Sequence, residues 1–464
     1  MGFSKQRWVE RLKRHTGLDR AIGYTVLARG LQIIGSTGTV LLIVRFLTPV
    51  EQGYYYTLLS LAALQTIFEL GFSFVILQLA AHESVHVTFH PDGRVDGDVV
   101  AHARLASVLQ KLVRWYIGAG ALMITTLLPL GVFFFSRHAQ RAGEVAWHGP
   151  WAFVVIATAI MFMLDPFFSF LEGCGQVRPV AGMRFAQGFA AISVPWAAMI
   201  AHHGLYAPGA INTAYSLVGL VFLWSRRKLL LGLLRHRTGS SGISWRTEVW
   251  RFQWQIAVTY LCAYFTAQVL TPILFMCLGP VDAGRMGMSM NIASYMWVVV
   301  IAWMSTKASP FGQLIARGEI EQLDKLFFRT LKQSVTLLAG IVLVCMAILI
   351  VVQGAYPKLA ARMLPPHTFV LLLLTSMSTL VIQSEAIYLR AHKNEPFLWQ
   401  SIMVAGVTCC GALLLVPLWG SAGAATSYFF GTSVVGLIAA TAIFQRKRKS
   451  GRQSQPTAVV QVEA

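Results

Sequence analysis

The chain has 464 residues, of which 56% are hydrophobic and only 12% are charged, and its formal net charge is +19. A soluble domain normally carries about 25% charged residues, so this composition excludes a soluble globular protein as well as disordered, collagen-like and disulfide-rich classes. Its mean hydropathy is +0.60, and its length accommodates twelve spans of about 20 residues with short connections. We therefore predict a multi-span, all-α integral membrane protein. The positive charge indicates basic cytoplasmic loops rather than a nucleic-acid partner.

The chain begins with a basic stretch, Lys5 to Arg20, that lacks the apolar core and small-residue cleavage site of a signal peptide. Apolar runs broken by polar residues follow, and Gly or Pro marks several of their ends, for example Gly53, Pro179 and Gly420. The runs predict about twelve transmembrane helices, at 24–46, 54–80, 109–136, 150–172, 180–202, 205–225, 252–278, 286–308, 333–354, 367–389, 398–418 and 422–444.

Lys and Arg are distributed unevenly between the two sides of this topology. One side carries the basic N-terminal stretch, the segment 226–251 and the run 446–452. The connections on the other side carry Arg137, Arg141, Arg285, Lys358 and Arg362. Because cytoplasmic loops accumulate positive charge, both termini are predicted to be cytoplasmic, which requires an even number of spans.

The long basic segment in mid-chain predicts a linker between two six-helix lobes. It contains a Gly-Ser-Ser-Gly sequence and lies between the sixth and seventh spans. The predicted parts are an N-terminal lobe at 1–225, a cytoplasmic linker at 226–251, a C-terminal lobe at 252–444 and a basic cytoplasmic tail at 445–464.

An internal repeat supports this division. Leu47–Gly53 follows the first span and Leu278–Gly284 follows the seventh, and both read L-x-P-V-acid-x-G. Half-repeats at matching topological positions are typical of transporters. Within the first copy, Thr48 and Glu51 have the spacing of a capping box at a helix start, and Asp282 in the second copy predicts the same arrangement.

Two segments of the first eighty residues resemble a known family. Arg45–Tyr56 and Phe68–Gln78 are similar to polysaccharide and O-antigen (Wzx-like) flippases of the MOP superfamily, which also contains the MATE exporters and the lipid II flippases. Glu172–Val177 resembles the cytoplasmic turn of the same family. The resemblance implies twelve helices in two lobes around a central cavity.

This resemblance also implies a function and a location. The expected activity is translocation of a polyprenyl-diphosphate-linked oligosaccharide across the bacterial inner membrane by alternating access, for O-antigen, lipopolysaccharide or exopolysaccharide biosynthesis. The expected partners are this lipid-linked oligosaccharide and membrane lipids, with a polysaccharide polymerase and glycosyltransferases as candidate protein partners. No nucleic acid, cofactor or metal is expected.

Two other functions remain as alternatives. A MATE-like cation-coupled exporter of drugs or small metabolites would share the fold but not the cargo. A membrane enzyme, such as an O-antigen polymerase or ligase, needs a sizeable outer loop for its catalytic residues. The longest predicted outer loops, at about 137–150 and 355–366, are short and carry no paired carboxylates for acid–base chemistry. We therefore predict a protein that is not an enzyme.

Polar side chains inside the spans are the candidate substrate contacts. A charge at the centre of a transmembrane helix costs about 2.5–3.5 kcal/mol, so it usually faces a partner or a wet cavity. In the first span, Gln32 and Ser36 share the helical face of Arg29. The candidate substrate-binding residues are Arg29, Gln32, Ser36, Gln65, Glu69, Asp165, Arg184 and Glu385.

These charges have two interpretations that can coexist. They could form ion pairs between helices, such as Arg29 with Glu69, or they could contact the cargo. Guanidinium groups bind phosphate oxygens bidentately. The first span carries Arg29 and Arg45 and no carboxylate, whereas a cation exporter is expected to concentrate carboxylates there. The pattern therefore favours a diphosphate cargo.

One further motif has a metal-binding spacing. His82, Glu83 and His86 form an HExxH sequence, which on a continuous helix could bind zinc. However, Val87 and Phe89 continue an alternating pattern into a Pro-Asp-Gly turn, so we predict a hairpin after the second span and no zinc site. The six cysteines form no CxxC motif and are predicted to be core-packing residues.

Overall fold

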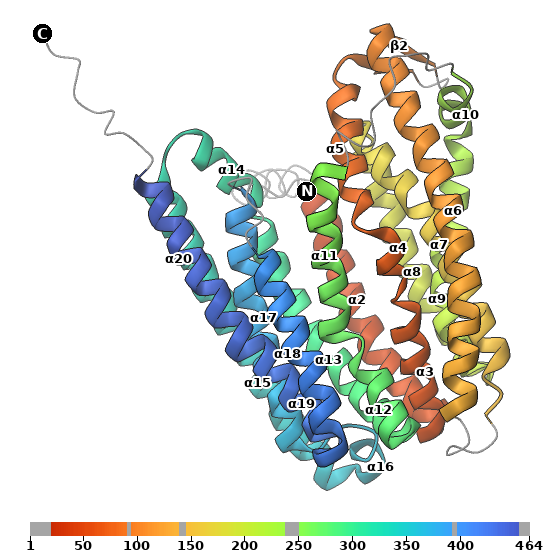
Figure 1. Cartoon of the computed structure of the whole chain (residues 1–464), viewed down its shortest axis with the longest axis vertical. Coiled ribbons are helices and arrows are strands. Elements are labelled where there is room, and N and C mark those ends of the chain that lie inside the picture. Colours follow the sequence, from red (N-terminus) through yellow and green to blue (C-terminus); the bar gives the residue numbers. More distant parts are fainter. Residues whose placement is uncertain (1–19, 91–93, 139–144, 237–249, 392–396, 454–464) are drawn as a thin grey trace, which may run out of the picture. The chain divides into compact units, whose positions relative to one another are not determined.

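The computed structural model describes residues 20–90, 94–138, 145–236, 250–391 and 397–453 (Figure 1). Contacts between Cα atoms divide the chain into two compact units. Unit 1 takes its described residues from Met1–Leu47, Leu64–Arg137 and Glu144–Ala257. Unit 2 takes its described residues from Thr48–Ala63, His138–Gly143 and Val258–Ala464.

Unit 1 is a helical bundle with one short hairpin. Its elements are α2 (Arg20–Phe46), α4 (Gln65–Glu69), α5 (Phe72–Ser84), β1 (Val87–Phe89), β2 (Val95–Gly97), α6 (Val99–His138), α7 (His148–Gly173), α8 (Val177–Ile200), a 3-10 turn (Gly204–Tyr206), α9 (Ala207–Ser225) and α10 (Arg227–Arg235). The helix α11 (Trp250–Ala267) carries the chain into unit 2.

Unit 2 is helical throughout its described residues. Its elements are α3 (Pro49–Ala62), α12 (Leu270–Leu278), α13 (Pro280–Ser305), α14 (Ala308–Ala316), α15 (Ile320–Ala355), α16 (Pro357–Ala360), α17 (Pro366–Ala391), α18 (Leu398–Trp419), α19 (Ser421–Phe429), a π-helical segment (Phe430–Gly436) and α20 (Leu437–Gln453).

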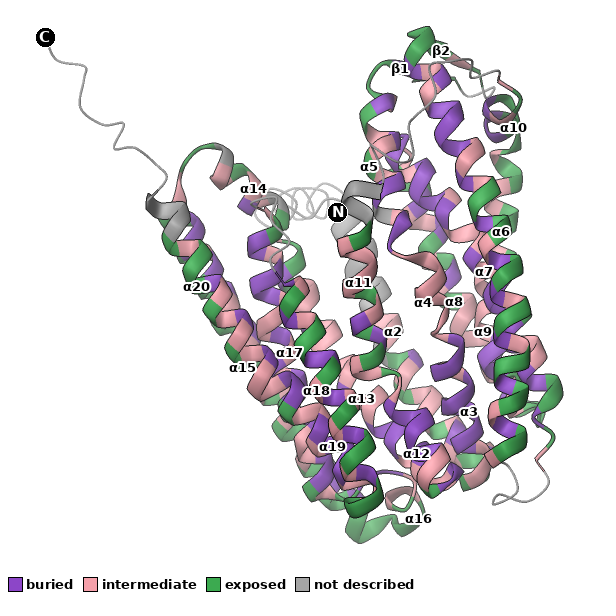
Figure 2. Cartoon of the chain, in the orientation of Figure 1, coloured by how far each residue is buried: buried purple, intermediate pink, exposed green. Residues whose placement is uncertain are grey.

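The helices have the length and surface of membrane spans. Within the described residues, nine helical segments are long and apolar enough to cross a membrane: Val99–His138, His148–Gly173, Gly204–Ser225, Trp254–Leu278, Pro280–Ile315, Ile320–Ala355, Pro366–Ala391, Leu398–Trp419 and Ser421–Lys449. Large apolar side chains such as Phe133 on α6 and Leu343 on α15 are 63% and 70% exposed, as expected for surfaces that face lipid (Figure 2). The protein is a multi-pass, all-α membrane protein, which confirms the predicted class.

The other three predicted spans correspond to α2, in which Gly30–Phe46 is an apolar helix, to α3–α5 and to α8. In α8, Arg184 and Gln187 lower the hydropathy. The predicted span 54–80 is not continuous, because it divides into α3, α4 and α5. Between α4 and α5, Leu70 and Gly71 have φ angles of 50° and 70°. Glycine adopts this left-handed conformation readily, whereas a leucine is strained there.

The two copies of the repeat contact each other within unit 2. Helix α3 packs on α13, where a Cβ atom added to Gly53 would overlap the carbonyl of Pro280. A Cβ atom added to Gly284 would lie 2.9 Å from the backbone nitrogen of Gly53. Two small residues therefore allow the backbones of α3 and α13 to approach closely.

A buried amide reinforces this helix crossing. Gln52 Nε2 donates hydrogen bonds to the Gly284 carbonyl at 2.9 Å and to the Arg362 carbonyl at 3.0 Å. In return, Arg362 Nη1 donates to Gln52 Oε1 at 3.3 Å. The repeat was visible in the sequence, but the contact between its two copies was not predicted.

The predicted helix starts are confirmed in both copies, since α3 begins at Pro49 and α13 at Pro280, but the capping box forms only in the first copy. Thr48 and Glu51 form the capping box, since Glu51 N donates to Thr48 Oγ1 at 3.2 Å and Thr48 N donates to Glu51 Oε2 at 2.8 Å. The second copy does not repeat it, because Gly279 stands at the cap position and has no side chain to accept. Asp282 instead accepts from Arg285 Nη1 at 3.3 Å.

The mid-chain segment contains more structure than a linker. Its first part forms the amphipathic helix α10, and residues 237–249 lie outside the described residues. Gln110 of α6 donates to the Leu234 carbonyl at 3.1 Å and to the His236 carbonyl at 2.8 Å. This amide satisfies carbonyl groups at the end of α10 and attaches the helix to unit 1.

Candidate functional site

Half-buried and exposed polar side chains from several helices of unit 1 lie near one another. Glu69 ends α4, directly before the left-handed break, and its Oε1 accepts a hydrogen bond of 3.1 Å from Ser73 of α5. Tyr116 of α6 and Asp165 of α7 lie close enough to interact electrostatically with Glu69. The break therefore places a carboxylate beside a second carboxylate within a bundle of apolar helices.

A cation from α8 faces these acids. Arg184 interacts electrostatically with Asp165 and with Tyr215 of α9. Its Nη2 also lies 3.8 Å from Glu172 Oε2, near the end of α7. The Arg184 side chain is 47% exposed and that of Glu172 is 32% exposed, so this ion pair is long and partly hydrated. Arg184 is therefore shared among several anions rather than locked to one.

The structure brings three of the predicted site residues together in unit 1, namely Glu69, Asp165 and Arg184. Gln65 lies one turn before Glu69 on α4, and its Oε1 is buried without a hydrogen-bond partner among the described residues. We call Gln65, Glu69, Ser73, Asp165 and Arg184 the unit 1 polar cluster. It combines two carboxylates, a cation and two uncharged groups that can exchange hydrogen bonds with a ligand.

The remaining predicted residues lie elsewhere or are only partly described. Gln32 and Ser36 are half-buried on α2, which packs on α8. Arg29 belongs to α2, but its side chain lies outside the described residues, so its pairing with Glu69 stays a prediction. Glu385 belongs to α17, which is part of unit 2 and not of unit 1.

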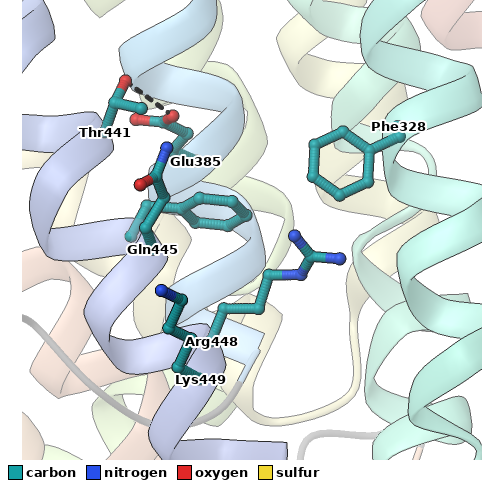
Figure 3. Close-up of a pocket in the computed structure, with 7 residues that line it drawn as sticks. Phe328, Glu385, Thr441, Gln445, Arg448 and Lys449 are labelled. Atoms are coloured by element: carbon teal, nitrogen blue, oxygen red, sulfur yellow. Dashed lines mark hydrogen bonds between the residues drawn. The ribbon is translucent and has the colours of Figure 1, made fainter.

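Glu385 lines a cavity of about 260 Å³ within unit 2 (Figure 3). The residue is only 4% exposed, and its Oε1 accepts a 3.0 Å hydrogen bond from Thr441 Oγ1 of α20. Its Oε2 is buried without a hydrogen-bond partner among the described residues. The cavity is lined by Phe328, Glu385, Thr441, Phe444, Gln445, Arg448 and Lys449.

The sequence analysis missed a buried charge network next to this cavity. Asp324 is 4% exposed and accepts hydrogen bonds from Arg448 Nε at 3.0 Å and from Tyr388 at 2.9 Å. The Arg448 guanidinium also lies 4.7 Å from the ring centroid of Phe328. A signal was present in the sequence, because the spacing of the apolar residues Leu323 and Phe327 predicts one face of a helix that starts before residue 333. Asp324 lies directly beside this face, and in the structure all three residues are buried.

The HExxH sequence does not lie on one helix. Helix α5 ends at Ser84, and β1 and β2 pair antiparallel just beyond it, which confirms the predicted hairpin. His82 is therefore on the helix, whereas His86 follows it. Glu83 is held by Arg104, whose Nε donates to Glu83 Oε1 at 2.7 Å. In the part of the chain that the structure describes, no group of three or more His, Cys, Asp or Glu residues is arranged to hold a metal ion.

Comparisons with known proteins show the fold. No protein-family model and no curated protein sequence matches the chain. The structure of the lipid II flippase MurJ in an inward closed conformation is similar, with a TM-score of 0.56 and 11% identity over 93% of this chain and 90% of that one. A multidrug resistance MATE family transporter in an inward-facing conformation has a TM-score of 0.53 and 13% identity over 90% of this chain and 99% of that one. The chain has the fold of MOP superfamily transporters.

This result confirms the predicted fold class. The similar structures include a lipid flippase and a drug transporter at nearly equal scores and low identity, so the fold does not discriminate between the two cargoes. Any discrimination between a lipid-linked anion and a cationic drug must therefore be argued from the side chains of the unit 1 polar cluster.

Proposed function

We propose that the protein is a flippase for a polyprenyl-diphosphate-linked oligosaccharide in the bacterial inner membrane, working by alternating access. The protein moves its cargo without making or breaking covalent bonds in it. The oligosaccharide of this cargo is an O-antigen or exopolysaccharide unit. The observation that carries the proposal is Arg184, a half-exposed cation of unit 1 that lies near Asp165 and is held only loosely by Glu172. The sequence of the first span contains two further arginines, Arg29 and Arg45, and no carboxylate.

The physical problem for such a flippase is the diphosphate. An unshielded anion cannot cross about 30 Å of hydrocarbon without groups that replace its hydration. An arginine supplies charge-assisted, bidentate hydrogen bonds to phosphate oxygens. Because its bond to Glu172 is 3.8 Å long, Arg184 can exchange one anion for another at little cost. The carboxylates then keep Arg184 paired when no cargo is bound.

Uncharged members of the cluster suit the sugar part of the cargo. Gln65 Oε1 is a buried acceptor without a partner among the described residues, and a sugar hydroxyl is a donor that would satisfy it. The Ser73 hydroxyl, which now donates to Glu69, can both donate and accept. These groups provide weak, exchangeable bonds, which a carrier needs because a tightly bound cargo would not be released.

A MATE-like exporter of organic cations is the second candidate. It is favoured by the proximity of Glu69 and Asp165, since two carboxylates could bind a cationic drug or couple its export to protons. The two candidates differ in what Arg184 does, because a cation next to the carboxylates assists a diphosphate and repels a cationic drug. Removal of Arg184 therefore has opposite effects in the two cases.

The test is surface-glycan display in a strain that lacks the native gene. We expect Arg184→Ala to abolish display at normal abundance in the membrane, and Arg184→Lys to restore it only partly. Arg29→Ala is predicted to have the same effect as Arg184→Ala. Arg178→Ala is the matched control, because Arg178 is an arginine in the first turn of the same helix that does not belong to the unit 1 polar cluster. Normal display by Arg184→Ala would remove Arg184 from the cargo path.

A further inference from the structure

The cavity in unit 2 has a different chemistry from the unit 1 polar cluster. Helices α15, α17 and α20 provide its lining, and Figure 3 shows Glu385 and Thr441 at one end with Arg448 and Lys449 at the other. We propose that this cavity binds the headgroup of a phospholipid that carries a primary ammonium and a phosphate, with the ammonium at Glu385 and the phosphate at Lys449. This role goes beyond the proposed transport activity.

The carboxylate end of the cavity has an unsatisfied group. Glu385 Oε1 accepts from Thr441, but Oε2 is buried and accepts no hydrogen bond from any described residue. A buried carboxylate oxygen without a donor is costly, and an acid within a transmembrane helix normally faces a partner. Glu385 is one of the residues that line the cavity, so a ligand bound there would lie next to its carboxylate. The missing donor is therefore expected to come from a ligand.

The opposite end of the cavity is cationic. Arg448 is already bound to Asp324 by hydrogen bonds of 2.9 and 3.0 Å, so it closes the wall of the cavity. Lys449 is exposed, and its side chain extends toward Gln445 in Figure 3. Lys449 follows Thr441 by just over two turns of α20, and helical side chains lean toward the N-terminus of their helix. Its ammonium is therefore directed along the cavity toward the Glu385 end.

A ligand that carries both charges fits this pair of ends better than one with a single charge. An anion alone would leave Oε2 of Glu385 unsatisfied and would approach a carboxylate. A cation alone would meet the ammonium of Lys449. A phosphoethanolamine-type headgroup places an ammonium with three N–H donors a short distance from a phosphate. The volume of about 260 Å³ suits a headgroup and is too small for a diphosphate-linked oligosaccharide.

The surroundings of the cavity are typical of the level of lipid headgroups. Helix α20 continues through Arg446 and Lys447 at this end, and basic residues gather where transmembrane helices leave the membrane. Phe328 lines the cavity and is 42% exposed, so its ring offers an apolar surface for the glycerol and upper acyl chains. A lipid could thus enter from the bilayer with its headgroup at the correct depth.

The experiment compares three lipids on the full-length protein. Purified protein is placed in nanodiscs of matched acyl chains containing phosphatidylethanolamine, phosphatidylcholine or phosphatidylglycerol. Retained lipids are counted by native mass spectrometry, and the unfolding temperature is measured for each composition. We expect preferential retention of one phosphatidylethanolamine and a higher unfolding temperature with it. The choline headgroup lacks N–H donors and the glycerol headgroup lacks a cation, so both should be retained less.

Variants locate the site. Glu385→Gln should abolish the preference for phosphatidylethanolamine and Lys449→Gln should reduce it, whereas Glu321→Gln should leave it unchanged. Glu321 is an apt control, because it is an exposed acid on α15 paired with Lys325. If Glu385→Gln does not fold, the Lys449→Gln variant and the comparison of the three lipids still test whether the cavity binds this headgroup. Equal retention of all three lipids, or an unchanged preference in Lys449→Gln, would overturn the proposal.

Discussion

The two units hold their interior charges in different ways. In unit 2, Asp324 is 4% exposed and is bound by Arg448 and Tyr388 at 2.9 to 3.0 Å. In unit 1, Arg184 is 47% exposed and lies 3.8 Å from its partner Glu172. A buried, fully bonded charge is costly to disturb, whereas a partly hydrated pair contributes little to stability. The comparison indicates that the Asp324 network maintains the fold, and it supports the proposed role of Arg184 in binding cargo.

The largest expected effect comes from breaking the buried network. Asp324→Ala leaves the partly buried Arg448 guanidinium without its carboxylate, which should lower the free energy of unfolding by about 3 kcal/mol, the lower end of the range for a buried pair. Thermal unfolding of the purified protein measures this loss, with Glu321→Ala on the same helix as an exposed control. An unchanged unfolding temperature in Asp324→Ala would remove the distinction between the two units.

A smaller loss is expected at the contact between the two repeat copies. Gly53→Ala places a methyl group against the Pro280 carbonyl, and because backbone cannot move aside as a side chain can, we expect a loss of about 1–3 kcal/mol. Gly118→Ala on α6 is the matched control, since a Cβ atom there meets nothing within 4 Å. Equal stability of the two variants would mean that α3 and α13 do not pack as closely as described.

The capping box should contribute less than the helix crossing. Thr48→Ala removes the oxygen that accepts from Glu51 N, and loss of such a cap typically costs about 0.5–2 kcal/mol. Thr48→Ser keeps the acceptor and is expected to keep most of the stability. The same unfolding assay compares the two, and a Ser variant as unstable as the Ala variant would show that the methyl group of Thr48 matters instead.

The smallest effect on stability is expected for Arg184→Ala, although this substitution is expected to have a large effect on transport. Because the Arg184–Glu172 pair is long and partly exposed, Arg184→Ala should change the free energy of unfolding by no more than about 1 kcal/mol. Its unfolding temperature should therefore stay close to that of Arg178→Ala. A loss as large as that of Asp324→Ala would make Arg184 a structural residue.

Local chemistry explains what the sequence could predict. Hydropathy located the membrane helices, and the Thr48–Glu51 spacing identified a true cap, because both depend on residues close in the chain. The second helix start was also correct, but it lacks a capping box because Gly279 has no side chain to accept a hydrogen bond. Asp324 was missed because the charged stretch before residue 333 was interpreted as a connection between two spans. In the structure this stretch is already helical, since α15 begins at Ile320.

Contacts between distant segments set the limit of prediction. The repeat was recognised, but nothing local shows that Gly53 packs against Gly284, 231 positions further along the chain. The break at Leu70 and Gly71 is likewise absent from the hydropathy pattern, because a strained leucine persists only where tertiary packing holds it. Of the predicted site, Glu69, Asp165 and Arg184 meet in unit 1, while Glu385 belongs to a separate cavity.

The most direct test of the transport proposal uses purified protein in proteoliposomes. A polyprenyl-diphosphate-linked oligosaccharide is placed in one leaflet, and its appearance in the other is measured as the fraction accessible to an external glycan-modifying enzyme. We predict transfer between leaflets with the wild-type protein and with Arg178→Ala, and no transfer above that of protein-free vesicles with Arg184→Ala. Folded wild-type protein that fails to move this lipid but exports an organic cation, with export enhanced in Arg184→Ala, would contradict the proposal.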